Sequence, residues 1–159
     1  ASFARHAPAQ ARLVIKNHPL DTGLVNYPKI IRALSSRFDL ADRVDYLETG
    51  NLEALLLHAR GTVTVNSTVG ALSLGFNCPT VALSDPIYSM PGLTFQGPLD
   101  DFWQGRTLPD AELFRHFRNT VIHTTQVNGG FYCRDGIALS VEGSRRLLAS
   151  PRSPLEELL

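Results

Sequence analysis

The stretch Gly61–Asp85, "GTVTVNSTVGALSLGFNCPTVALSD", decides the fold. Its apolar alternation predicts a strand over residues 62–65, and a second apolar run predicts another over residues 80–83. Between them the chain turns polar and then small, and Ser67 is a good N-cap for a helix that begins there. A strand, a helix and a strand with short connections predict two parallel strands joined by a crossover helix.

The same alternation of strands and helices extends toward the N-terminus. The upstream strands read as apolar runs, which is typical of strands buried on both faces. We therefore expect an α/β fold, a parallel sheet with helices on both faces. The upstream strands are expected over residues 12–16 and 43–49, and the helices over 27–38 and 51–60.

Beyond the last strand the chain is rich in proline, glycine and aromatic residues, which predicts a long ordered loop with a helical turn. We expect its aromatic residues to pin the loop to the core, and one of Asp100 and Asp101 to cap a helix. Helices are predicted over 111–125 and 142–149, with a small hairpin near Asp135-Gly136. Residues 1–150 would form a single domain and residues 151–159 a tail. The pinning aromatic residues are Tyr88, Phe95, Phe102 and Trp103.

Composition excludes several classes of protein. The chain has 159 residues, 43% hydrophobic and 19% charged, and its 15 basic residues balance 15 acidic ones. A neutral chain has no overall attraction to nucleic acid. No apolar run approaches the roughly 20 residues that span a bilayer, and the first residues do not resemble a signal peptide. We expect a cytoplasmic location, and because the sequence lacks a starting methionine, a fragment of a longer protein.

The third strand ends in a segment that could bind an anion. Ligands of such sheets bind beyond the carboxyl ends of the strands, where a helix start offers free N–H groups and a positive dipole end. The hydroxyls of Ser67 and Thr68 could add hydrogen bonds, and Gly70 would let a ligand approach the backbone. Ser67 could equally serve only as a helix cap. Asn66 and Val69 complete this candidate binding segment.

A second candidate segment follows the first strand. Pro19 holds His18 in an extended conformation, so its imidazole would project from the strand end and could donate to a phosphate or protonate an oxygen. Lys16 and Asn17 precede it as further polar candidates. A histidine at a strand end can also be an ordinary polar surface group. Motifs for a zinc site, a Walker loop, a dinucleotide fold and a hydrolase serine are missing.

Four segments follow one another along the chain: "KNHPLD", "NSTVGALSLGFNCPTVAL", "IYSMPGLTFQGPLDDFW" and "TQVNGGFYCRDGIALSV". Together, in this order, they resemble the capsule polysaccharide biosynthesis proteins of Gram-negative bacteria, which include β-Kdo glycosyltransferases. The resemblance covers residues 12–148. It implies a GT-B architecture of two Rossmann-like halves, in which this chain is the C-terminal, donor-binding half.

The resemblance also implies a ligand and site residues. The donor would be CMP-Kdo, bound without metal or other cofactor, and His18 would act on its phosphate as the catalytic residue. The segment from Ser67 to Gly70 matches the family's Ser-Thr-Val-Gly motif, and Gln96 would border the same cleft. The other half would hold the lipid-linked glycan acceptor. Other capsule assembly proteins and the inner face of the inner membrane are further expected contacts.

Three hypotheses remain open for the function. In the first, the chain is the CMP-Kdo-binding half of a glycosyltransferase and is inactive alone. In the second, it is a non-catalytic interaction domain of the capsule machinery. The third is another sugar-nucleotide enzyme of the same architecture, such as an epimerase.

Overall fold

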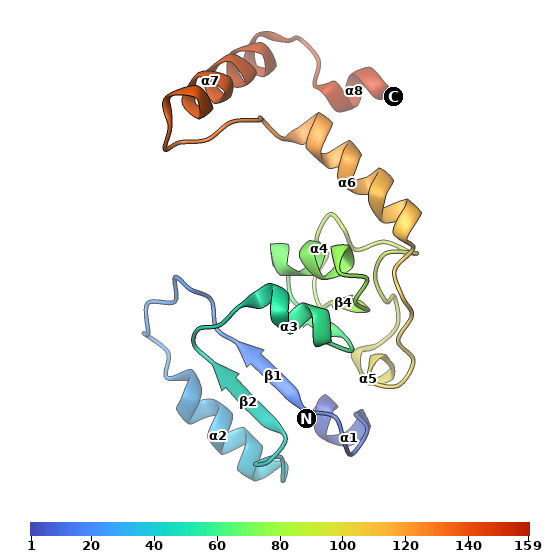
Figure 1. Cartoon of the computed structure of the whole chain (residues 1–159). Helices are drawn as coiled ribbons and strands as arrows, with labels where there is room; N and C mark the ends of the chain where they lie inside the picture. The colour runs from blue at the N-terminus through green and yellow to red at the C-terminus, as the bar shows by residue number, and fades with distance from the viewer. The chain divides into compact units, whose positions relative to one another are not determined.

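The central strand–helix–strand unit forms as predicted in the computed structural model, which describes residues 1–159 (Figure 1). Strands β3 (Thr62–Thr64) and β4 (Thr80–Ala82) pair in parallel, with Thr62 opposite Thr80. Helix α4 (Thr68–Gly75) connects them and packs on both. This element belongs to the first of two units, Ala1–Asp110 and Ala111–Leu159.

The upstream strands also pair with each other. Strand β1 (Leu13–Lys16) lies parallel to β2 (Val44–Leu47), in a register that places the first residues of the two strands opposite each other. Helix α2 (Tyr27–Arg37) joins them and contacts β2, and α3 (Leu52–His58) leads on to β3. The sequence therefore placed all four strands and these connecting helices correctly.

The expected single sheet is wrong in one respect, because the strands form two separate two-stranded sheets, β1-β2 and β3-β4. Burial on both strand faces is also incomplete. Val14 in β1 is 44% exposed and Val65, just after β3, is 62% exposed. The strands of the second sheet have three residues each. Pairing between the two sheets would therefore add few hydrogen bonds to offset the conformational entropy lost when the backbone is ordered.

A buried chain of hydroxyls joins α4 to its sheet. The Ser73 hydroxyl donates to Thr62 Oγ1 at 2.8 Å, and the Thr80 hydroxyl donates to Ser73 Oγ at 2.9 Å. Ser73 and Thr80 are almost fully buried, beside Leu74 and Val81. Because every member of this chain has a hydrogen-bond partner, its polar atoms are buried without an unsatisfied group.

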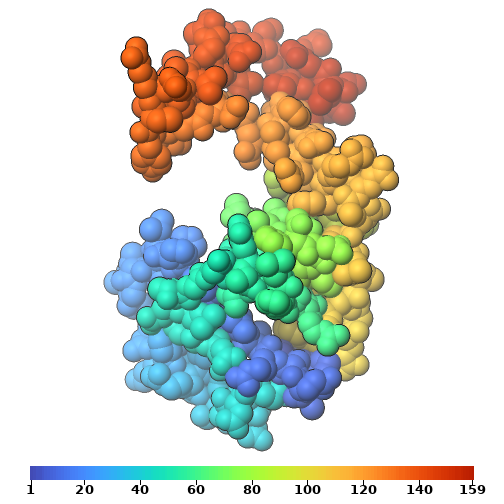
Figure 2. Space-filling view, in the orientation of Figure 1, coloured from blue at the N-terminus to red at the C-terminus, as the bar shows by residue number.

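The long loop is anchored by aromatic packing, as predicted. Helix α5 (Leu99–Phe102) packs against α1 (Ser2–His6), and the dark blue and yellow segments meet in Figure 2. The rings of Phe3 and Trp103 meet edge to face at 5.2 Å, and Phe102 lies 5.9 Å from Trp103. Neither aspartate caps α5, which corrects that expectation. Its N-cap is Pro98, and the neighbouring acidic residue Asp100 contacts His6 at 3.3 Å instead.

The second unit consists of three helices, α6 (Ala111–Thr125), α7 (Arg134–Ala149) and α8 (Pro154–Leu158). The predicted hairpin is wrong, because α7 already begins at Arg134. Cys133 is its N-cap, and Asp135 lies in the first turn, where a negative charge favours a helix over the turn that Asp-Gly suggested. Residues 151–159, expected as a tail, contain α8 with its capping box. No helix is long and apolar enough to cross a membrane.

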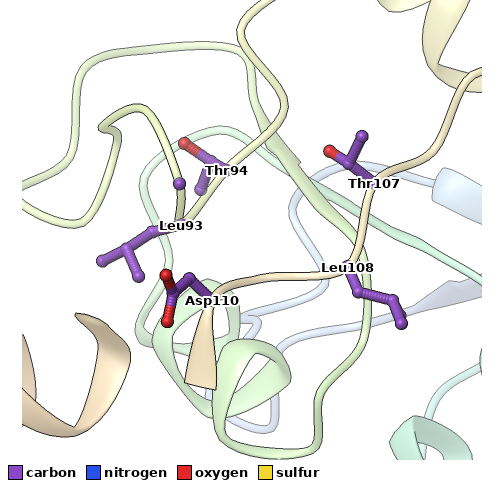
Figure 3. Close-up of a pocket in the computed structure, with 6 residues that line it drawn as sticks. Leu93, Thr94, Thr107, Leu108 and Asp110 are labelled. Atoms are coloured by element: carbon purple, nitrogen blue, oxygen red, sulfur yellow. The ribbon is translucent and has the colours of Figure 1, made fainter. Parts of the chain in front are cut away.

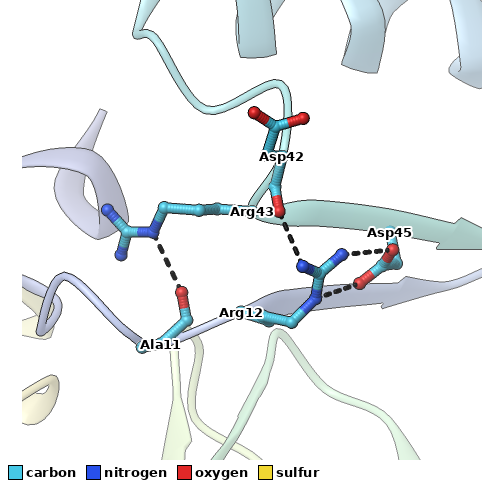
Figure 4. Close-up of polar contacts among 5 residues, drawn as sticks. All are labelled: Ala11, Arg12, Asp42, Arg43 and Asp45. Atoms are coloured by element: carbon cyan, nitrogen blue, oxygen red, sulfur yellow. Dashed lines mark hydrogen bonds and ion pairs between the residues drawn. The ribbon is translucent and has the colours of Figure 1, made fainter.

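Charged side chains tie the start of β1 to β2 (Figure 4). Arg12 binds the Asp45 carboxylate through two hydrogen bonds of 2.9 and 3.0 Å, and also donates to the carbonyl of Asp42 at 2.7 Å. Arg43 donates to the carbonyl of Ala11 at 3.0 Å. The hydrogen bond from Arg12 lowers the pKa of Asp45 below its usual value.

Replacing Arg12 by glutamine should raise the pKa of Asp45 toward its usual value, because the bidentate bond and the positive charge are lost. A carboxyl whose pKa is lower in the folded protein stabilises the fold above its unfolded pKa. That contribution disappears as the pH falls through the folded pKa. The effect on stability is small since both groups are largely exposed.

A carbon-detected NMR titration of the aspartate carboxyls would measure this shift. Arg32→Gln, at an exposed position of α2, is the matched control and should leave the Asp45 pKa unchanged. An equal pKa for Asp45 in wild type and Arg12→Gln would contradict the prediction.

Candidate functional site

Because the strands pair in parallel, the carboxyl ends of β1 and β2 lie side by side, and so do those of β3 and β4. At the end of the first sheet, the Lys16 ammonium donates to the carbonyl of Asn17 at 2.7 Å and to that of Glu48 at 3.3 Å. Glu48 directly follows β2, so Lys16 joins the two strand exits. The Lys16 ammonium thus binds backbone oxygens, so this candidate residue has a structural role at the ends of β1 and β2.

His18 lies in a tight turn just beyond β1. The backbone N–H of Leu20 donates to His18 Nδ1 at 3.1 Å, and the carbonyl of His18 accepts from the N–H of Asp21 at 3.0 Å. The Asn17 amide donates to Asp21 at 2.9 Å, which braces the turn. Because Nδ1 is an acceptor, the neutral imidazole carries its proton on Nε2. His18 and Pro19 are exposed, so this N–H donor faces solvent.

Ser67 caps α4, as one of the two readings predicted. Its Oγ accepts from the N–H of Val69 at 3.2 Å, and its carbonyl accepts from the N–H of Gly70 at 3.0 Å. These bonds occupy two of the amides expected to face an anion. The N–H of Thr68 has no acceptor in the protein, and the side chains of Thr68 and Asn66 are exposed. Thr68 is therefore the donor that this helix start leaves for a ligand.

Gly70 has a packing role that the sequence did not indicate. A Cβ at this position would lie 2.5 Å from Cζ and 2.6 Å from Cε2 of Tyr88. The Tyr88 hydroxyl donates to the Ser67 carbonyl at 2.5 Å, and the side chain is only 4% exposed. Burial raises the pKa of the Tyr88 phenol. Tyr88, which follows β4, thus occupies the space beside Gly70 in which the sequence predicted a ligand.

Gln96 lies in the long loop and contacts Thr94, one of the residues that line a pocket in the first unit (Figure 3). Its amide donates to the carbonyl and the hydroxyl of Thr94 at 3.0 and 2.8 Å. Thr94 belongs to the wall of this pocket, whose volume is about 450 Å³. The remaining wall residues are Gly92, Leu93, Thr107, Leu108 and Asp110.

The structure divides the candidate residues into two groups. The turn around His18 belongs to the β1-β2 sheet, whereas the segment from Asn66 to Gly70 belongs to the β3-β4 sheet. No hydrogen bond or ion pair joins His18 to Ser67 or Thr68. The sequence did not predict that Tyr88 is the partner of the Ser67 carbonyl. The one feature that could have indicated it is the position of an aromatic residue shortly after β4. No three His, Cys, Asp or Glu side chains lie close enough to hold a metal ion.

Comparison with known proteins gives one consistent result. Residues 1–132 match the family described as capsule polysaccharide biosynthesis protein. The capsule polysaccharide export protein KpsS of Escherichia coli is 41% identical over 131 residues, which is 82% of this chain and 34% of that protein. The capsule polysaccharide modification protein LipB of Neisseria meningitidis serogroups A and B is 41% identical over 133 residues, 83% of this chain and 32% of the relative.

The chain thus spans about a third of the length of these curated relatives. Both candidate segments lie within the matched residues. Helices α7 and α8 lie entirely beyond them. No solved structure matches this chain.

Proposed function

Because this chain belongs to the family of capsule polysaccharide biosynthesis proteins, we propose that it is the donor-binding half of a capsule glycosyltransferase. The donor is CMP-Kdo and the architecture of the whole protein is GT-B. The other half binds a lipid-linked glycan that accepts Kdo. The proposal places the protein in the cytoplasm at the inner face of the inner membrane, together with other capsule assembly proteins.

The observation that supports this proposal most directly is the state of His18. Its Nδ1 is held by the Leu20 amide, so the neutral ring presents an exposed Nε2–H donor at a strand end. Phosphate oxygens of bound nucleotides are commonly met by donors at this edge of a parallel strand pair. The amide of Thr68, at the start of α4, is a second donor of the same kind.

The proposed reaction needs charge stabilisation rather than a nucleophile from this chain. The bond between the anomeric carbon of Kdo and the phosphate oxygen breaks, and its electron pair leaves with CMP. A hydroxyl oxygen of the acceptor forms the new bond to the anomeric carbon, and its proton passes to a base outside this chain or to the departing phosphate. Preorganised N–H donors that bind the growing negative charge lower the activation barrier. Each donor contributes a few kcal/mol, which corresponds to a rate increase of about 10²–10³. We assign this role to His18 and Thr68, with Ser67 holding the helix start in place.

Titration of the chain with CMP, followed by amide NMR, tests the proposal. We expect saturable shifts around His18 and Thr68, and at least tenfold weaker binding in His18→Ala, because a hydrogen bond to a charged group is lost. His58→Ala, at an exposed position of α3, is the matched control and should bind CMP like the wild type. Weaker competition by UDP would argue against an epimerase or another UDP-sugar enzyme.

A folded chain that shows no shifts at millimolar CMP would overturn the donor-site proposal. It would favour the second candidate, a non-catalytic interaction domain of the capsule machinery. The observation behind this candidate is the apolar surface of the second unit. Helix α7 has no buried residue, and Phe131 just before it is 82% exposed.

A further inference from the structure

A second pocket of the first unit opens near the amino-terminal ends of β3 and β4, whereas Ser67 and Thr68 follow the carboxyl end of β3. Its walls come from the segments that precede the two strands, residues 59–60 before β3 and residues 77–79 before β4. The third wall is the loop after α5. The pocket is open to solvent and has a volume of about 340 Å³. The lining residues are Ala59, Arg60, Asn77, Pro79, Arg106 and Leu108.

The Arg106 side chain lies beside Gly61. Its Cδ lies 3.3 Å from the position that a Cβ of Gly61 would take, and Phe102 Cζ lies 2.9 Å from the same point. The absence of a side chain at Gly61 therefore gives room to both. The Arg106 guanidinium donates one hydrogen bond, from Nη1 to the carbonyl of Arg60 at 3.3 Å. Its other N–H groups remain for a ligand.

Neither arginine of this pocket forms an ion pair with a carboxylate, so both charges are available to an anion. Arg12, Arg115, Arg145 and Arg146 each form an ion pair with an acidic side chain. Neither Arg60 nor Arg106 does, although both line one pocket. An anion in this pocket would be attracted by both positive charges.

We propose that the pocket lined by Arg60 and Arg106 binds a phosphate-class oxyanion carried by a small ligand. Guanidinium groups match phosphate oxygens in geometry as well as charge. Asn77 offers an amide donor at the rim, and Pro79 and Leu108 supply apolar walls for the part of the ligand that carries the anion. The site is separate from the CMP site proposed above, because Ser67 and Thr68 follow β3 whereas Arg60 precedes it.

Titration of the 159-residue chain with sodium phosphate, followed by amide NMR, tests this site. We expect saturable shifts at Arg60, Asn77 and Arg106, which sodium chloride of equal ionic strength does not reproduce. Arg60→Gln and Arg106→Gln should each weaken phosphate binding at these amides about tenfold or more, since a charged hydrogen-bond donor is lost. Arg32→Gln should bind phosphate as tightly as the wild type.

Arg106→Lys provides a variant that keeps both the charge and most of the packing stem. It should bind phosphate more weakly than the wild type, because an ammonium cannot reproduce the planar fork. The proposal is overturned if the folded Arg60→Gln and Arg106→Gln proteins bind phosphate like the wild type. It is also overturned if chloride causes the same shifts. Neither outcome depends on CMP binding near His18.

Discussion

Replacing Phe102 by alanine is expected to lower the free energy of unfolding by about 3–5 kcal/mol. The side chain is 1% exposed and lies between the rings of Phe95 and Trp103, at 5.6 and 5.9 Å. It also fills the space beside Gly61. The substitution leaves a cavity where α5, the loop and the start of β3 meet, and the surrounding backbone can collapse into it only in part.

Urea unfolding followed by far-ultraviolet circular dichroism measures this change. Phe131→Ala is the matched control, because that ring is exposed and its loss should change stability by less than about 0.5 kcal/mol. A Phe102→Ala protein as stable as the Phe131→Ala protein would show that the aromatic cluster does not hold the loop.

Gly70→Ala should destabilise the protein by about 1–3 kcal/mol, the usual range for overpacking a core. Alanine favours a helix over glycine by about 1 kcal/mol, so a substitution on α4 would ordinarily stabilise it. Here the new methyl group meets the Tyr88 ring at 2.5 Å, and either the ring or the helix must move. Movement of the ring would break the bond from its hydroxyl to the Ser67 carbonyl.

A double-mutant cycle tests the cause of this loss. In Tyr88→Phe the ring is no longer held by the Ser67 carbonyl and can move aside, so Gly70→Ala should cost less than it does in the wild type. Gly130→Ala is the control, because a Cβ there meets no atom within 4 Å. Equal costs of Gly70→Ala in both backgrounds would rule out the clash with Tyr88 as the cause.

The contact between Gly70 and Tyr88 changes the picture of the proposed donor site. The glycine gives room to a tyrosine that holds the Ser67 carbonyl, and Ser67 in turn caps α4. The donor that remains at this helix start is the amide of Thr68. In the proposal the two donors are therefore the imidazole N–H of His18 and the amide N–H of Thr68, with Tyr88 and Ser67 supporting the position of Thr68.

Sequence patterns predicted the local elements well, for reasons that are local. Asn51 and Ser67 each cap the helix that follows, because their side chains accept hydrogen bonds from amides three and two residues further along. Apolar alternation likewise placed β3, and short apolar runs placed β1, β2 and β4. The same reasoning failed at Asp135-Gly136, where a turn signal also suits the first turn of a helix, and Cys133 provided the cap.

The sequence by itself determined the four strands, the helices that connect them, and the polar residues that follow each strand. Only the tertiary structure decided that β1 pairs with β2 and β3 with β4 in separate sheets. It also decided that Tyr88 rather than a ligand lies beside Gly70. The physical reason is range: capping and periodicity act over a few residues, whereas sheet pairing and ring packing join segments far apart in the chain and depend on what else competes for the same space.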